Sequence, residues 1–121
     1  RSDIDAWMNR YLLAGVALFR ARRFEEADRQ LAQAFEIAPS VDIALVRGQI
    51  AGGRQDWRAA EQQLELARKL DGTRADVLYQ LALAQSLTGN MAAAQETART
   101  LERAHPAFPQ LTQLKGTLGL R

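Results

Sequence analysis

The sequence contains no cysteine, one histidine and only three prolines in 121 residues. The absence of cysteine excludes disulfide bridges, thiol nucleophiles and cysteine metal ligands, although it does not distinguish the cytosol from the periplasm. With so few prolines and only eight glycines, the composition does not match a disordered or fibrous segment. No run of about 18 uncharged apolar residues is present, so we expect no membrane-spanning segment and no membrane contact.

A strong charge of either sign is also missing, because the formal net charge is only +2. Residues 1–40 hold six basic and six acidic side chains, and the stretches 41–74 and 75–121 each have one basic side chain in excess. Proteins that bind nucleic acid usually carry a basic stripe on one face, so this balance argues against a nucleic-acid partner. The basic cluster at residues 20–23 is predicted to be a solvated helix end.

Groups suited to catalysis or metal binding are scarce. The histidine, His105, precedes Pro106 in a predicted turn and has no serine or cysteine partner motif. Carboxylates are scattered, mostly beside arginines, and Gly52 and Gly53 read as a helix end rather than a phosphate loop. We therefore expect no enzymatic activity, no cofactor and no metal site.

What the sequence does contain is an internal repeat. The segments 22–40, 54–72 and 88–106 can be aligned without a gap when the first is displaced by one residue. Three alanines then coincide, at spacings of 33 and 34 residues: Ala27, Ala60 and Ala94. Three positions before each alanine stands a large apolar residue: Phe24, Trp57 and Met91. Self-similarity at such a period is the signature of a repeat architecture.

Each repeat predicts two antiparallel helices joined by a short turn. The three pairs are expected over residues 3–21 and 24–37, 41–52 and 56–70, and 75–87 and 91–104. Glycine inside a helix lowers its stability by up to about 1 kcal/mol relative to alanine, so Gly15 and Gly48 indicate close helix crossings. Ser2, followed three residues later by Asp5, resembles a capping box, so the first helix should begin near Asp3.

These residues resemble the tetratricopeptide repeat family over residues 8–108. Besides Gly15, the residues of the first repeat that match the family's pattern are Tyr11, Ala27, Leu31, Ala34 and Pro39. The second repeat departs at Arg47, where leucine is usual, and at Gly72, which replaces proline; in the third, Ala98 and Leu101 exchange the usual large and small residues. The resemblance implies one all-α, right-handed superhelical array over 1–121, with repeats at about 8–40, 41–74 and 75–108.

The segment 109–121 is either a capping helix or the first helix of a fourth repeat. Pro109 can open a helix, and Leu111, Leu114 and Leu118 recur on one stripe. A cap should present a polar surface, so this apolar stripe favours a truncated repeat. An exposed stripe of this kind predicts end-to-end self-association.

In the family, the first helices line a concave groove that receives a peptide or a partner helix. By the resemblance, the groove residues of this chain are Asn9, Leu12, Val16, Phe19, Arg20, Asp42, Leu45, Val46, Gln49, Asp76, Tyr79, Gln80 and Leu83. The aliphatic members are explained equally well as core residues, whereas Tyr79 combines an apolar ring with a hydroxyl and is the better binding candidate. The carboxylate clamp of co-chaperone repeats is absent, and Asp42 and Asp76 disfavour an acidic peptide, although they also suit helix starts.

The resemblance also suggests a biological role. The chain contains fourteen arginines, only two lysines and no cysteine. In this composition it resembles the periplasmic repeat scaffolds of bacterial exopolysaccharide export systems, such as the Pel system. The first residue is arginine rather than methionine, so we expect a piece of a longer protein. The resemblance implies a non-catalytic scaffold for a protein partner, such as a polysaccharide-modifying enzyme, located in the periplasm or alternatively the cytoplasm. Direct sugar binding is not favoured, because no tryptophan is expected on the groove wall.

Two other roles remain open at this stage. The repeats can serve as a structural spacer between flanking domains, with an unoccupied groove. They can also form a regulatory domain that is attached to an enzyme or belongs to another assembly, such as a pilus or a secretion system.

Overall fold

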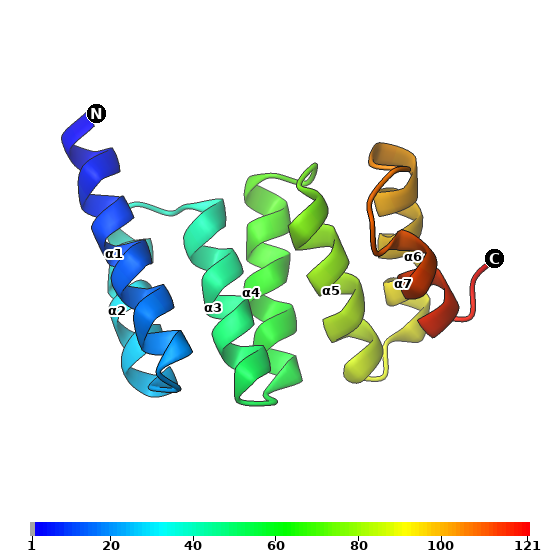
Figure 1. Cartoon of the computed structure of the whole chain (residues 1–121), viewed down its shortest axis with the longest axis horizontal. Coiled ribbons are helices and arrows are strands. Elements are labelled where there is room, and N and C mark those ends of the chain that lie inside the picture. Colours follow the sequence, from blue (N-terminus) through cyan, green and yellow to red (C-terminus); the bar gives the residue numbers. More distant parts are fainter. Residues whose placement is uncertain (1) are drawn as a thin grey trace.

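The chain folds into antiparallel helix pairs that stand side by side along the long axis of the molecule (Figure 1). The computed structural model describes residues 2–121, and within them the helices are α1 (Ser2–Arg20), α2 (Phe24–Ile37), α3 (Val41–Gly53), α4 (Trp57–Leu70), α5 (Ala75–Leu87), α6 (Met91–Ala104) and α7 (Leu111–Thr117). No strand occurs in this described part of the chain. The predicted all-α solenoid is therefore confirmed.

The boundaries predicted for the first six helices differ from those observed by no more than one residue. Side chains are described from Asp3 onward, so the capping contact predicted for Ser2 lies outside the described part. Three of the later helices are preceded by a residue whose side chain accepts hydrogen bonds from backbone N–H groups of the first turn: Ser40 before α3, Asp56 before α4 and Asn90 before α6. These local caps fix the helix starts because the first N–H groups of a helix have no partner within it.

The helices of the first two pairs approach closely at their glycines. A Cβ atom added to Gly15 would stand 2.7 Å from Leu31 Cδ1, and one added to Gly48 would stand 2.8 Å from Leu64 Cγ. In the third pair, Ala82 and Ala98 occupy the equivalent positions, and both are fully buried in one core cluster. In the third pair, alanine therefore replaces leucine at position 98 of the second helix, and alanine replaces glycine at position 82 of the first helix.

Arg47, where the family usually has leucine, pairs with Asp28 of the preceding repeat. Its Nε donates a 2.9 Å hydrogen bond to Asp28 Oδ1. An ion pair between α3 and α2 therefore takes the place of an apolar contact.

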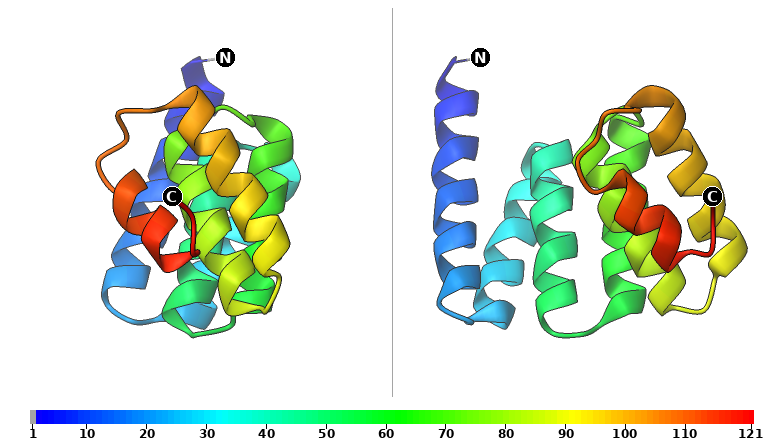
Figure 2. Two further views of the ribbon diagram at one scale, coloured as in Figure 1. Left: turned by 90° about the vertical axis from the view of Figure 1, so that its right-hand side faces the viewer. Right: turned by 45° about the vertical axis from the view of Figure 1, so that its right-hand side comes forward.

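The C-terminal apolar stripe is not exposed, so that prediction was wrong. Helix α7 begins at Leu111, two residues after Pro109, and lies against α5 and α6 (Figure 2). Leu111, Leu114 and Leu118 are only 7%, 1% and 2% exposed and pack in the core of the third repeat.

Polar contacts tie α7 and the residues after it to α6. Gln95 Nε2 donates to the Leu118 carbonyl at 2.8 Å, and Lys115 Nζ lies 2.6 Å from Glu102 Oε2. The residues of α7 that face solvent are small or polar: Thr112, Gln113, Gly116 and Thr117. Helix α7 therefore covers the core of the third repeat and presents a polar outer surface. This arrangement removes the reason given for end-to-end association.

Candidate interaction surface

A cup of about 410 Å³ opens between α3, α4 and α5, with one residue of α1 at its edge. Five of the predicted groove residues line this central cup: Phe19, Gln49, Tyr79, Gln80 and Leu83. The sequence-based prediction missed the remaining lining residues, which are Gly48, Gly52, Trp57, Ala60, Leu64 and Ala84. The first helices of all three repeats therefore contribute to the cup, and α4 supplies part of its lining.

Two glycines of α3 line the cup. Gly48 and Gly52 lie four residues apart and hence on the same side of the helix, where neither contributes a side chain. A Cβ atom at Gly52 would stand 3.3 Å from Trp57 Cζ3, and one at Gly53 would stand 3.0 Å from Phe19 Cε1. Two aromatic rings can therefore approach the α3 backbone closely.

The position of Trp57 overturns the expectation that no tryptophan lies on the groove wall. From the sequence, this residue is expected only as part of the repeat framework, three positions before Ala60. The missed signal was Gly52, which stands 33 residues after Phe19, at the equivalent position of the next repeat. Gly52 contributes no side chain to the cup, and Trp57 of α4 lies beside it in the lining.

Two aromatic pairs support the cup. Phe19 packs against Phe24 with ring centroids 5.8 Å apart, and Tyr79 packs against Phe108 at 5.4 Å. Such tilted pairs favour a fixed ring orientation. Phe108, in the turn before α7, is a supporting residue that the sequence-based prediction did not include.

The other predicted groove residues have different environments. Leu45 and Val46 are only 7% and 9% exposed and belong to the core, so their assignment to the groove was wrong. Leu12 and Val16 are half-buried and pack against the core cluster that contains Leu31 and Ile43. The two exposed polar residues of α1 that were predicted, Asn9 and Arg20, do not line the cup.

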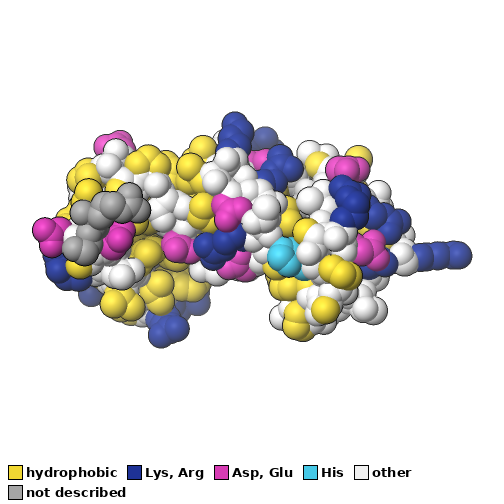
Figure 3. All heavy atoms as spheres, turned by 90° about the horizontal axis from the view of Figure 1, so that it is seen from above, with side chains coloured by type: hydrophobic (Ala, Val, Ile, Leu, Met, Phe, Trp, Pro, Cys, Tyr) yellow, Lys and Arg dark blue, Asp and Glu magenta, His cyan; other side chains and the backbone are white. Residues whose placement is uncertain are grey.

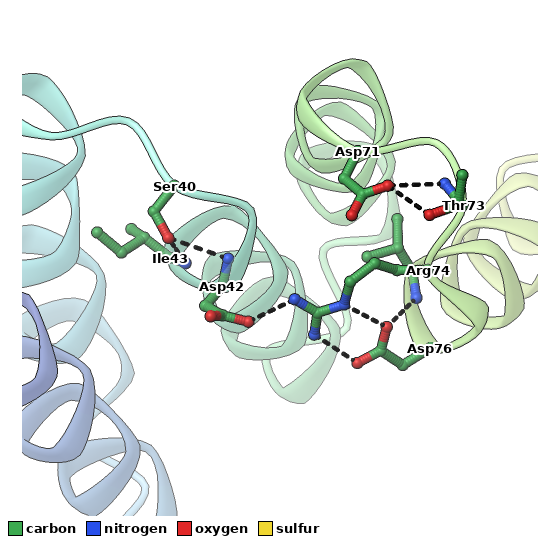
Figure 4. Close-up of polar contacts among 8 residues, drawn as sticks. Ser40, Asp42, Ile43, Asp71, Thr73, Arg74 and Asp76 are labelled. Atoms are coloured by element: carbon green, nitrogen blue, oxygen red, sulfur yellow. Dashed lines mark hydrogen bonds and ion pairs between the residues drawn. The ribbon is translucent and has the colours of Figure 1, made fainter. Parts of the chain in front are cut away.

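Asp42 and Asp76 are bridged by an arginine that the sequence-based prediction did not include (Figure 4). Arg74 Nη1 lies 2.7 Å from Asp42 Oδ1, and Nη2 lies 2.8 Å from Asp76 Oδ2. Hydrogen bonds to these two carboxylates raise the pKa of the Arg74 guanidinium, and the bond from Arg74 is the main cause that lowers the pKa of Asp76. This Arg74 clamp, made of Arg74, Asp42 and Asp76, joins the starts of α3 and α5. It neutralises part of the negative charge expected to repel acidic peptides.

The next turns are joined in a similar way. The imidazole Nε2 of His105, at the end of α6, is hydrogen-bonded to the Thr73 carbonyl. The Asp71 carboxylate accepts bonds from the hydroxyl and backbone N–H of Thr73, which lowers the pKa of Asp71. His105, predicted to be a solvated turn residue, thus connects two inter-repeat turns.

Replacing Arg74 with glutamine is expected to raise the pKa of Asp76 toward its ordinary value. Because the folded state lowers this pKa, the Asp76 carboxylate stabilises the fold above its unfolded pKa, and this contribution is lost as the pH falls through the folded value. Arg74→Gln should therefore reduce the acid dependence of stability. NMR titration of the aspartate side-chain carbons measures the pKa directly, with Arg103→Gln on α6 as the control. An Asp76 pKa that is the same in wild type and Arg74→Gln would contradict this role of the clamp.

Charge on the remaining surface is mixed. Basic and acidic side chains are interspersed over the face seen in Figure 3. Among the described residues, no three His, Cys, Asp or Glu side chains are grouped so that they could hold a metal ion. Within the same residues, no helix has both the length and the hydrophobicity needed to span a membrane.

Comparison with known proteins identifies the fold. No protein-family model and no curated protein matches the chain. The second tetratricopeptide repeat domain of human RPAP3, solved by NMR in complex with the HSP70 peptide SGPTIEEVD, superposes with a TM-score of 0.82 and 16% identity over 89% of this chain and 91% of that one. A crystal structure of a type III secretion system (T3SS) complex from Aeromonas hydrophila contains a chain with a TM-score of 0.79 and 15% identity, covering 94% and 77% respectively. The fold of this chain is the tetratricopeptide repeat fold.

Proposed function

We propose that this chain is a non-catalytic protein-interaction module that holds a segment of a partner protein in the central cup. One observation carries the proposal: the cup is lined by the rings of Phe19, Trp57 and Tyr79, and the chain's own side chains leave it open. Its volume falls in the range of ligand-binding clefts, and tyrosine and tryptophan in partly enclosed hollows are the usual anchors of protein interfaces.

The peptide complex of the RPAP3 domain supports this reading by analogy of fold. Fold alone does not establish function, so the argument depends on the cup itself. The spacer alternative differs in one respect, because it requires no occupant for the cup.

We further propose that the module belongs to a periplasmic scaffold of a bacterial exopolysaccharide export system such as the Pel system, with a polysaccharide-modifying enzyme as its partner. The support is compositional, namely the arginine-rich, lysine-poor and cysteine-free repeats. The likeness to a chain of the type III secretion complex favours a second candidate, a repeat domain of a secretion assembly. Capturing the partner separately from periplasmic and cytoplasmic extracts shows in which of these two compartments the partner is found.

The double variant Phe19→Ala, Tyr79→Ala should recover at least about tenfold less of the partner than wild type in a pull-down from envelope extract, because it removes two anchor rings. The matched control is Leu66→Ala, Leu70→Ala, which removes two exposed apolar side chains of α4 outside the cup. Thermal unfolding must show that both variants are folded, since Phe19 and Tyr79 also pack against other rings. Equal recovery of the same partner by wild type and the cup variant would rule out the cup as the docking site.

A further inference from the structure

The polar groups that line the cup are uncharged. They are the side-chain amides of Gln49 and Gln80 and the hydroxyl of Tyr79. Gln85 and Gln95, outside the cup, hydrogen-bond to Glu65 and to the Leu118 carbonyl respectively. By contrast, among the described residues, neither cup glutamine makes a side-chain hydrogen bond within the chain. Their donors and acceptors are therefore available to a ligand.

The charged groups of the Arg74 clamp satisfy one another. Arg74 donates to Asp42 at 2.7 Å and to Asp76 at 2.8 and 3.2 Å. A partner carboxylate would have to compete with two carboxylates already in place. No lysine or arginine lines the cup itself. The cup lining is thus complementary to an uncharged segment and holds no cation to bind a terminal carboxylate.

We infer, on the basis of the proposed function, that the cup takes an internal, uncharged and extended segment of the partner protein. Its apolar side chains lie against Phe19, Trp57 and Tyr79, and the amides of Gln49 and Gln80 bond its main chain. An amide offers both a donor and an acceptor, as a peptide group does. An extended segment has peptide groups free for such bonds, whereas those of a helix are already paired within it.

A sugar fits the cup less well than a peptide segment. Apart from the two glutamines and Tyr79, its lining is apolar or glycine. Each sugar residue carries several hydroxyls that need partners once water is removed, and three polar side chains cannot satisfy them. Neutral oligosaccharide is therefore the competing ligand in the test.

Two displayed libraries of short random peptides test the inference with the full chain. In one library both peptide ends are joined to the carrier, and in the other the C-terminal carboxylate is free. We expect enrichment from the first library of sequences whose central residues are apolar and uncharged. Enrichment that requires the free carboxylate, enrichment of charged centres, or no enrichment from either library would overturn the inference.

A selected peptide, acetylated and amidated, is then titrated while the fluorescence of Trp57 is followed in a Trp7→Phe background, because the chain has only two tryptophans. A central aspartate in the peptide should weaken binding by about tenfold or more. Gln49→Ala and Gln80→Ala should each weaken it severalfold, and Gln62→Ala, at an exposed glutamine of α4 outside the cup, should not. A saturable shift with a neutral oligosaccharide and none with the peptide would also overturn the inference.

The two proposals fail in different ways. If the cup variant loses its natural partner while the libraries select charged or terminal sequences, the inference fails and the proposed function stands. If neither partner capture nor peptide selection depends on Phe19 and Tyr79, the proposed function fails as well.

Discussion

Adding one methyl group at Gly48 is expected to lower the free energy of unfolding by about 1–3 kcal/mol, because it overpacks a helix crossing. The new Cβ would lie 2.8 Å from Leu64 Cγ and 3.0 Å from Leu64 Cδ2, and Leu64 is almost completely buried. Alanine has the higher helix propensity, by about 1 kcal/mol, so the steric term must exceed that gain. Urea denaturation of Gly48→Ala measures the balance.

The third repeat suggests a compensating change. Combining Gly48→Ala with Leu64→Ala creates the pair of alanines found at positions 82 and 98. Leu64→Ala alone should destabilise by about 2–5 kcal/mol through the cavity that it leaves. In the double variant the two effects should not add, because the methyl group no longer meets the leucine. Strict additivity of the two free-energy changes would contradict the proposed contact.

Gly116 provides the matched control, since it stands 34 residues after Ala82 at the equivalent position of α7. A Cβ atom there would meet nothing within 4 Å. Gly116→Ala should therefore stabilise the chain by about 0.5–1 kcal/mol through helix propensity alone. A shift of the same sign in Gly48→Ala and Gly116→Ala would show that helix crossing does not decide the effect.

The helix pairs could be predicted from the sequence because their determinants are local. The spacing of Ala27, Ala60 and Ala94 defines the repeat, and the two mid-helix glycines indicate the crossings. Whether the apolar stripe of α7 faces solvent or the core could not be predicted in the same way. Whether Leu114 faces solvent or the core depends on the turn before α7, and an apolar stripe is compatible with either arrangement.

The cup was only partly predictable for a related reason. Phe19 and Tyr79 were found because groove positions transfer along the first helices. Trp57 was missed because it lies on the second helix α4, beside Gly52 of α3, whereas the predicted groove positions came from first helices alone. Leu45 and Tyr79 occupy equivalent positions of successive repeats, so both were assigned to the groove. Tyr79 lines the cup, whereas Leu45 packs in the core.

The Arg74 clamp depends on the path of a loop. The sequence shows an aspartate at the start of α3 and another at the start of α5. It does not show that the residue before α5 turns back to reach both of them. A pair of acids that suggested repulsion of acidic ligands is instead a connection between repeats.

Replacing Leu114 with aspartate is expected to detach α7 from the third repeat. Leu114 is 1% exposed and packs in one cluster with Leu78 and Leu101, so a charge at this position cannot remain buried without a partner. A helix of seven residues has little stability by itself, so α7 should lose its structure when it undocks. Hydrogen exchange should show protection lost in α7 and reduced in α6, with α1–α4 unchanged.

The detached state also tests what α7 covers. Undocking exposes the apolar cluster of the third repeat, so Leu114→Asp should self-associate in sedimentation experiments more strongly than wild type does. Thr112→Asp is the matched control, because it adds the same charge to the exposed face of the same helix. That variant should keep wild-type exchange and sedimentation. If Leu114→Asp retains native protection in α7, or sediments as the wild type does, then packing of the stripe is not what keeps the apolar cluster of the third repeat covered.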